Sequence, residues 1–75
     1  MSPIPSLKYT EVIKFLSSLG YIKVRQKGSH IRFECHNRVS ITVPTHNPIT
    51  RGVLRKILRD CGETVENLKD FLGIE

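Results

Sequence analysis

The sequence predicts an α+β domain in the order α-β-β-β-α-α, in which helices cover one face of a three-stranded antiparallel sheet. Apolar residues recur every three or four positions near both ends of the chain, which is typical of helices, and every second position in the middle, which is typical of strands. Helices with one apolar stripe bury it against the one apolar face of such a sheet. The result is a two-layer sandwich whose other sheet face lies open to solvent.

All 75 residues are assigned to one domain, since a chain of this length supports a single hydrophobic core. Residues 1–6 contain two prolines and are predicted to form a flexible arm. The first helix is expected over residues 8–19. Its apolar stripe consists of Tyr9, Val12, Phe15, Leu16 and Leu19. Gly20 follows as the expected C-terminal cap.

The first strand is expected within residues 21–27, where apolar and basic residues alternate. Because successive side chains of a strand point to opposite faces, Ile22 and Val24 should face the helices. The other face of this strand should carry the basic residues Lys23, Arg25 and Lys27.

Two further strands are expected after a turn at residues 28–29. Alternation resumes over residues 30–35, and a third alternating run covers residues 39–43. Pro44 ends the third strand, because proline has no N–H to donate to the ladder. The side chains expected on the helix side are Ile31, Phe33, Cys35, Val39, Ile41 and Val43.

Two helices complete the predicted domain. The second helix is expected from about Thr50 to Cys61, with Gly62 as its stop. Its apolar face consists of Val53, Leu54, Ile57, Leu58 and Cys61. Thr64 can cap a last short helix through its hydroxyl. The apolar positions of that helix are Val65, Leu68, Phe71 and Leu72.

The basic residues are predicted to cluster. The chain has 12 Lys and Arg against seven Asp and Glu, a formal net charge of +5. Alternation places Lys23, Arg25, Lys27, His30 and Arg32 on the open sheet face, together with the neutral Ser40 and Thr42. The second helix adds a ridge of Arg51, Arg55 and Arg59. Clustered Lys and Arg favour a polyanionic partner such as a nucleic acid, and the alternative is an ordinary solvated face.

His30 stands at the start of the second strand, next to these cations. The residues alone leave two interpretations open: an incidental surface histidine, or a catalytic base. Nearby positive charge favours the neutral imidazole, which can accept a proton. Neighbouring Lys and Arg side chains could hold a phosphate and stabilise the charge that develops on it.

The remaining histidines and the cysteines do not predict a metal site. Cys35 and His36 are adjacent, while His46 and Cys61 lie far along the chain, which is not a zinc-ligand spacing. His36 lies in a polar turn, and His46 lies in the loop before the second helix, where it could reach an anion near that helix's N-terminus. Two free cysteines, no signal-peptide pattern and no long apolar run lead us to expect a cytoplasmic protein without a membrane segment.

Several blocks of the sequence resemble the HicA toxins of bacterial and archaeal toxin–antitoxin pairs. RQKGSH at residues 25–30, followed by Phe33, resembles the signature of that family. VPTHNPITRGVLRKILRDCG at residues 43–62 is similar to the family's strand end, histidine-bearing loop and basic second helix. TVENLKDFLG at residues 64–73 resembles its C-terminal helix, and the first helix running into residues 19–21 is similar as well. The resemblance covers nearly the whole chain in the same order.

The resemblance implies more than the residues show by themselves. HicA proteins are ribonucleases that cleave messenger RNA, arrest growth or translation, need no metal cofactor and share a fold like the double-stranded-RNA-binding domain. A HicB antitoxin binds and neutralises them. The histidine of the glycine–serine–histidine motif is the family's catalytic residue, which maps onto His30. The RNA-binding residues are then expected to be Lys23, Arg25, Lys27, Ser29, Arg32, His46, Arg51 and Arg55.

A metal-independent mechanism follows as a hypothesis. Neutral His30 would take the proton of a ribose 2′-hydroxyl, whose oxygen attacks the adjacent phosphorus and expels the 5′-oxygen. The general acid is not visible in the sequence. The alternative function is a non-catalytic RNA-binding module that uses the same basic face.

Overall fold

The structure is a computed structural model that describes residues 6–74. The described chain confirms the predicted α+β class and element order. The elements are α1 (Tyr9–Ser18), β1 (Ile22–Lys27), β2 (His30–Glu34), β3 (Ile41–Pro44), α2 (Arg51–Cys61) and α3 (Val65–Leu72). The predicted arm lies outside the described residues except for Ser6.

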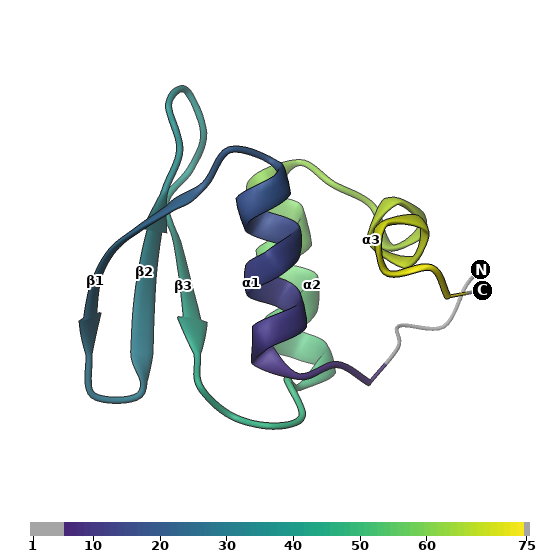
Figure 1. Ribbon diagram of the computed structural model, residues 1–75, viewed down its shortest axis with the longest axis horizontal. Coiled ribbons are helices and arrows are strands. Elements are labelled where there is room, and N and C mark those ends of the chain that lie inside the picture. The colour runs from purple at the N-terminus through teal and green to yellow at the C-terminus, as the bar shows by residue number, and fades with distance from the viewer. Residues whose placement is uncertain (1–5, 75) are drawn as a thin grey trace.

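The strands form one antiparallel sheet in the order β1-β2-β3. Helices α1 and α2 lie beside β3, whereas β1 forms the far edge of the sheet, and α3 lies beyond the other two helices (Figure 1). The largest fully buried side chains are Val12, Leu16, Val43, Leu54 and Leu68. They come from every helix and from β3, so the core lies between the helices and the inner part of the sheet.

The predicted alternation of β1 is wrong at its beginning, because a bulge interrupts the ladder. Arg25 lies opposite Arg32, but Lys23 lies opposite Phe33, and the register shifts between them. Val24 is the extra residue of this bulge. Residues opposite each other in an antiparallel pair share a face, so Lys23 lies on the side of the sheet that carries Phe33, not on the open face.

The bulge also leaves two apolar side chains of β1 in solvent. Ile22 lies opposite Glu34 on the open face and is 65% exposed, and Val24 is 43% exposed. The prediction that Ile22 faces the helices is therefore wrong, and Val24 is not part of the buried core. Lys23 instead donates a hydrogen bond to Gln26, 3.3 Å from Nζ to Oε1, on the same side of the strand.

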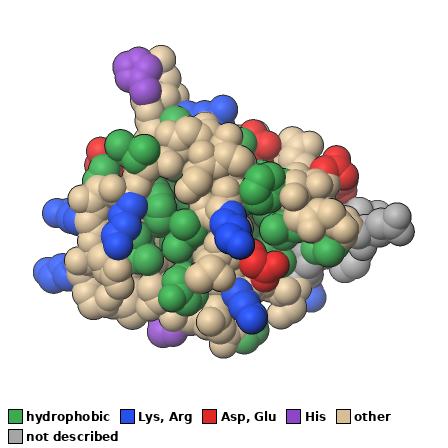
Figure 2. All heavy atoms as spheres, viewed as in Figure 1, with side chains coloured by type: hydrophobic (Ala, Val, Ile, Leu, Met, Phe, Trp, Pro, Cys, Tyr) green, Lys and Arg blue, Asp and Glu red, His purple; other side chains and the backbone are tan. Residues whose placement is uncertain are grey.

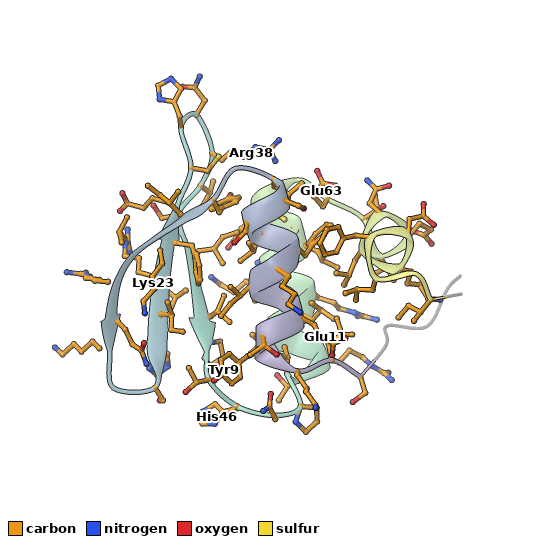
Figure 3. All side chains as sticks on the ribbon, viewed as in Figure 1. Tyr9, Glu11, Lys23, Arg38, His46 and Glu63 are labelled. Atoms are coloured by element: carbon orange, nitrogen blue, oxygen red, sulfur yellow. The ribbon has the colours of Figure 1, made fainter. Side chains whose placement is uncertain are left out.

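The third strand begins at Ile41, two positions later than predicted. Val39 lies in the preceding turn and is 59% exposed, while its carbonyl oxygen accepts a 2.8 Å hydrogen bond from the Tyr21 hydroxyl. Arg38 fixes the same turn to the end of α2, because its Nη1 donates to the Cys61 carbonyl at 2.7 Å and lies 3.9 Å from Glu63 Oε2 (Figure 3).

Helices α2 and α3 begin after threonine residues whose hydroxyls cap them, and α1 ends next to a glycine. The Thr50 hydroxyl accepts from the Val53 N–H at 3.3 Å, and the Thr64 hydroxyl accepts from the Asn67 N–H at 3.1 Å. Gly20 follows α1 with φ 100°, a backbone conformation that favours glycine. The predicted roles of Thr64 and Gly20 are therefore confirmed, and the structure adds Thr50 as the cap of α2.

The loop between β3 and α2 holds the start of α1. Asn47 Oδ1 accepts a 3.0 Å hydrogen bond from the Tyr9 N–H, one of the N–H groups that a helix leaves unpaired at its beginning. The Ile49 N–H donates to the Leu7 carbonyl at 2.8 Å, and Ile49 is buried. The described part of this loop therefore has a structural role that its sequence did not reveal.

Candidate functional site

The open face of the sheet carries two parallel rows of side chains, defined by strand register. One row runs from Lys27 on β1 through His30 on β2 to Pro44 on β3. The next row consists of Arg25, Arg32 and Thr42, in the same strand order. Adjacent rows are two residues apart along each strand, or roughly 6.6 Å.

These rows enclose a shallow hollow of about 220 Å³, lined by Arg25, Lys27, His30, Arg32 and Thr42. We call this the cationic hollow. Arg25, Lys27 and His30 are exposed and Arg32 is half-buried, so a polymer could reach the site from solvent. Lys and Arg side chains also project from the β1 edge, at the left of Figure 2.

The turn between β1 and β2 places His30 at the end of the hollow. Gly28 has φ 57°, and a two-residue hairpin turn favours glycine at this first central position. Lys27 and His30 flank the turn and therefore lie directly opposite each other. On the other side, the Ser29 carbonyl accepts a 2.7 Å hydrogen bond from the Thr45 N–H. The backbone around His30 is thus held by both neighbouring strands.

The electrostatics of the hollow favour an anion. Arg25 and Arg32 lie opposite each other, and like charges in this position destabilise a sheet. Glu34 relieves part of the repulsion, since its Oε2 lies 3.3 Å from Arg32 Nε. Within residues 6–74, neither Arg25 nor Lys27 forms an ion pair. A bound phosphate would supply the missing negative charge.

Four of the nine predicted site residues line the cationic hollow: Arg25, Lys27, His30 and Arg32. Ser29 lies in the adjoining turn, and Lys23 lies on the other side of the sheet. The remaining three are exposed and lie outside the hollow, on the loop after β3 and on α2: His46, Arg51 and Arg55. Figure 3 shows His46 on that loop.

Thr42 lines the hollow but was not among the predicted binding residues. Sequence analysis placed it on the open face as a neutral hydrogen-bonding group. Thr42 is identified as part of the site by its pairing opposite Arg32, and this strand register cannot be read from the sequence.

The described residues contain no group of three or more His, Cys, Asp or Glu side chains placed to hold a metal ion. Cys35 and Cys61 are both free thiols. Within residues 6–74, no helix has the length and apolar character needed to cross a membrane.

Comparisons with known proteins agree with the resemblance seen in the sequence. Residues 9–63 match a family described as the HicA toxin of bacterial toxin–antitoxin systems. The chain belongs to the HicA toxin family. The match runs from the first residue of α1 to just beyond α2, so it contains the whole cationic hollow, whereas α3 lies outside it.

A solved structure supports the same assignment. This HicA-family chain is similar to a chain of a toxin–antitoxin complex from Streptococcus pneumoniae, with 34% sequence identity and a TM-score of 0.63. The similarity covers 77% of this chain and 98% of the other. A search of curated proteins found no match to this HicA-family chain.

Proposed function

We propose that this HicA-family toxin is an endoribonuclease that cleaves messenger RNA in the cytoplasm and thereby arrests translation. The observation that carries the proposal is the position of His30 in an open hollow lined by three cations, two of which form no ion pair within residues 6–74. This arrangement suits a reaction in which negative charge grows on a phosphate beside a proton acceptor.

The reaction we propose is an internal transfer of the phosphate ester. Neutral His30 removes the proton of a ribose 2′-hydroxyl, and the 2′-oxygen forms a bond to the adjacent phosphorus. The bond from phosphorus to the 5′-oxygen breaks, and this oxygen takes a proton from water. The hydroxide left behind takes the proton from His30, which returns to its neutral form. The products are a 2′,3′-cyclic phosphate and a free 5′-hydroxyl. The reaction requires the 2′-hydroxyl, so DNA is not cleaved.

The cations have separate tasks in this proposal. Lys27 lies directly opposite His30 and can contact the phosphate under attack. Arg25 and Arg32 form the next row and can stabilise the extra charge of the transition state through their N–H groups. We propose that RNA on either side of the cleaved bond contacts residues outside the hollow, namely Ser29, His46, Arg51 and Arg55. Lys23 is not among these contacts, because it lies on the other side of the sheet.

We further propose that an antitoxin of the HicB type binds this toxin and covers the cationic hollow. The similar chain from Streptococcus pneumoniae comes from a toxin–antitoxin complex, which supports a protein partner of that kind. In this proposal, an acidic segment of the antitoxin pairs with the cations of the hollow that would otherwise contact RNA.

The decisive experiment compares wild type with His30→Ala on a long single-stranded RNA in the presence of EDTA. Wild type should produce fragments ending in a cyclic phosphate, and His30→Ala should cleave about 10²- to 10⁴-fold more slowly, as expected when a general base is removed. His36→Ala is the matched control, because His36 is exposed in a turn outside the hollow, and it should cleave like wild type.

Three outcomes bear on the proposal. Cleavage by His30→Ala at the wild-type rate would refute the role of His30. Cleavage that EDTA abolishes would refute the metal-independent reaction. If protein free of antitoxin binds RNA in a salt-sensitive way but produces no RNA fragments, the chain is instead a non-catalytic RNA-binding module.

A further inference from the structure

Thr42 carries the only hydroxyl group among the five side chains that line the cationic hollow. Arg25, Lys27 and Arg32 can only donate hydrogen bonds at neutral pH, and the accepting nitrogen of His30 is used for the attacking hydroxyl. Thr42 is exposed, and its hydroxyl forms no hydrogen bond with another described residue. It therefore remains available to accept from a substrate group.

The register shows which part of the substrate Thr42 can reach. Thr42 lies opposite Arg32, whereas His30 lies opposite Pro44, so Thr42 and His30 are diagonal neighbours on adjacent strands. The Cα atoms of such neighbours are separated by roughly 7–8 Å. This separation is comparable to the spacing of successive sugars along a stretched strand, so a strand whose attacking 2′-hydroxyl contacts His30 can place a neighbouring sugar at Thr42.

We propose that Thr42 is a positioning residue that accepts a hydrogen bond from the 2′-hydroxyl of a ribose next to the one that is cleaved. This inference rests on the proposed ribonuclease function and adds a second point at which the site distinguishes RNA from DNA. The neighbouring phosphate lies against Arg25 and Arg32, and the bond to Thr42 fixes the rotation of the strand so that the attacking 2′-hydroxyl faces His30.

A double-mutant cycle between protein and substrate tests this contact. The first substrate is an all-ribose oligonucleotide centred on a mapped cleavage site. The second substrate keeps the ribose at the cleaved position and has deoxyribose at both neighbours. Thr42→Val removes the hydroxyl and keeps the β-branched shape, whereas the matched control Thr42→Ser keeps the hydroxyl.

Wild type should lose about two- to tenfold in kcat/KM when the neighbouring 2′-hydroxyls are removed, the range expected of one neutral hydrogen bond. On the all-ribose substrate, kcat/KM of Thr42→Val should already be lower than that of wild type by this factor. Its kcat/KM should fall little further on the second substrate. Thr42→Ser should respond as wild type does.

Two results would overturn the inference: equal sensitivity of wild type and Thr42→Val to the neighbouring hydroxyls, or equal rates of both proteins on the all-ribose substrate. Failure of the proposed function has a different signature, since wild type would then cleave neither substrate. A merely structural role of Thr42 would slow both substrates equally in Thr42→Val and would leave the coupling at zero.

Discussion

Removal of one arginine from the cationic hollow should stabilise the protein while it weakens RNA binding. Arg25 and Arg32 lie directly opposite each other, which destabilises a sheet by roughly 0.2–1 kcal/mol. The ion pair of Arg32 with Glu34 at 3.3 Å offsets part of this repulsion. We therefore expect Arg25→Gln to raise the free energy of unfolding by about 0.2–0.5 kcal/mol at low salt.

Urea denaturation and thermal unfolding would measure this gain. For a domain of this size it corresponds to a rise in Tm of about 1–4 °C. The gain should disappear near 1 M salt, where the screening length falls to about 3 Å. In an RNA-binding titration, the slope of log affinity against log salt should become shallower by about 0.7, because one phosphate contact is lost.

The matched control is Lys14→Gln, which removes an exposed charge from α1. Its unfolding free energy should stay within about 0.5 kcal/mol of wild type, and its salt slope should not change. A less stable Arg25→Gln protein at low salt, or one with unaltered RNA affinity, would contradict the assignment of Arg25 to an anion site.

Two further predictions concern the fold. Asn47→Ala removes the acceptor for the Tyr9 N–H at the start of α1. It should lower the free energy of unfolding, measured in urea, by about 0.5–2 kcal/mol and should leave RNA cleavage unchanged. A variant as stable as wild type would show that this contact is dispensable. Burial raises the pKa of the Cys61 thiol and that of the Tyr21 phenol. The unfolded chain then loses these protons first. The stability that these two groups contribute should therefore be constant below about pH 8.5 and should fall as the pH rises above it. Alkaline unfolding followed by circular dichroism should show a shallower decline above about pH 10 for Tyr21→Phe than for wild type, and identical declines would exclude Tyr21 as a contributor.

Local patterns in the sequence were sufficient to predict the helices and the element order. Thr64 caps a helix as expected and the second helix begins after Thr50 as expected, because a capping hydroxyl acts within three residues of its own position. Leu54 and Leu68 are buried as expected, because the helical period determines which side chains face the core.

Features that depend on pairing between distant segments could not be predicted in this way. The bulge at Val24 reverses the faces of Ile22 and Lys23, although the sequence there alternates regularly. Thr42 joins the hollow because of its register with β2, and Asn47 caps a helix 38 residues away in the sequence. Each of these depends on a non-local contact that alternation and composition do not encode.

The bulge in β1 has a consequence for how this molecule avoids self-association. Within the described sheet, β1 pairs only with β2, so its outer edge offers unpaired backbone groups to another strand. The extra residue Val24 bends this edge, and the charges of Lys23, Arg25 and Lys27 repel a second copy of the same strand. The bend and these charges therefore disfavour pairing of this edge with the same strand of a second copy. In the proposed function, Arg25 and Lys27 would contact RNA, and the same two side chains oppose extension of the sheet.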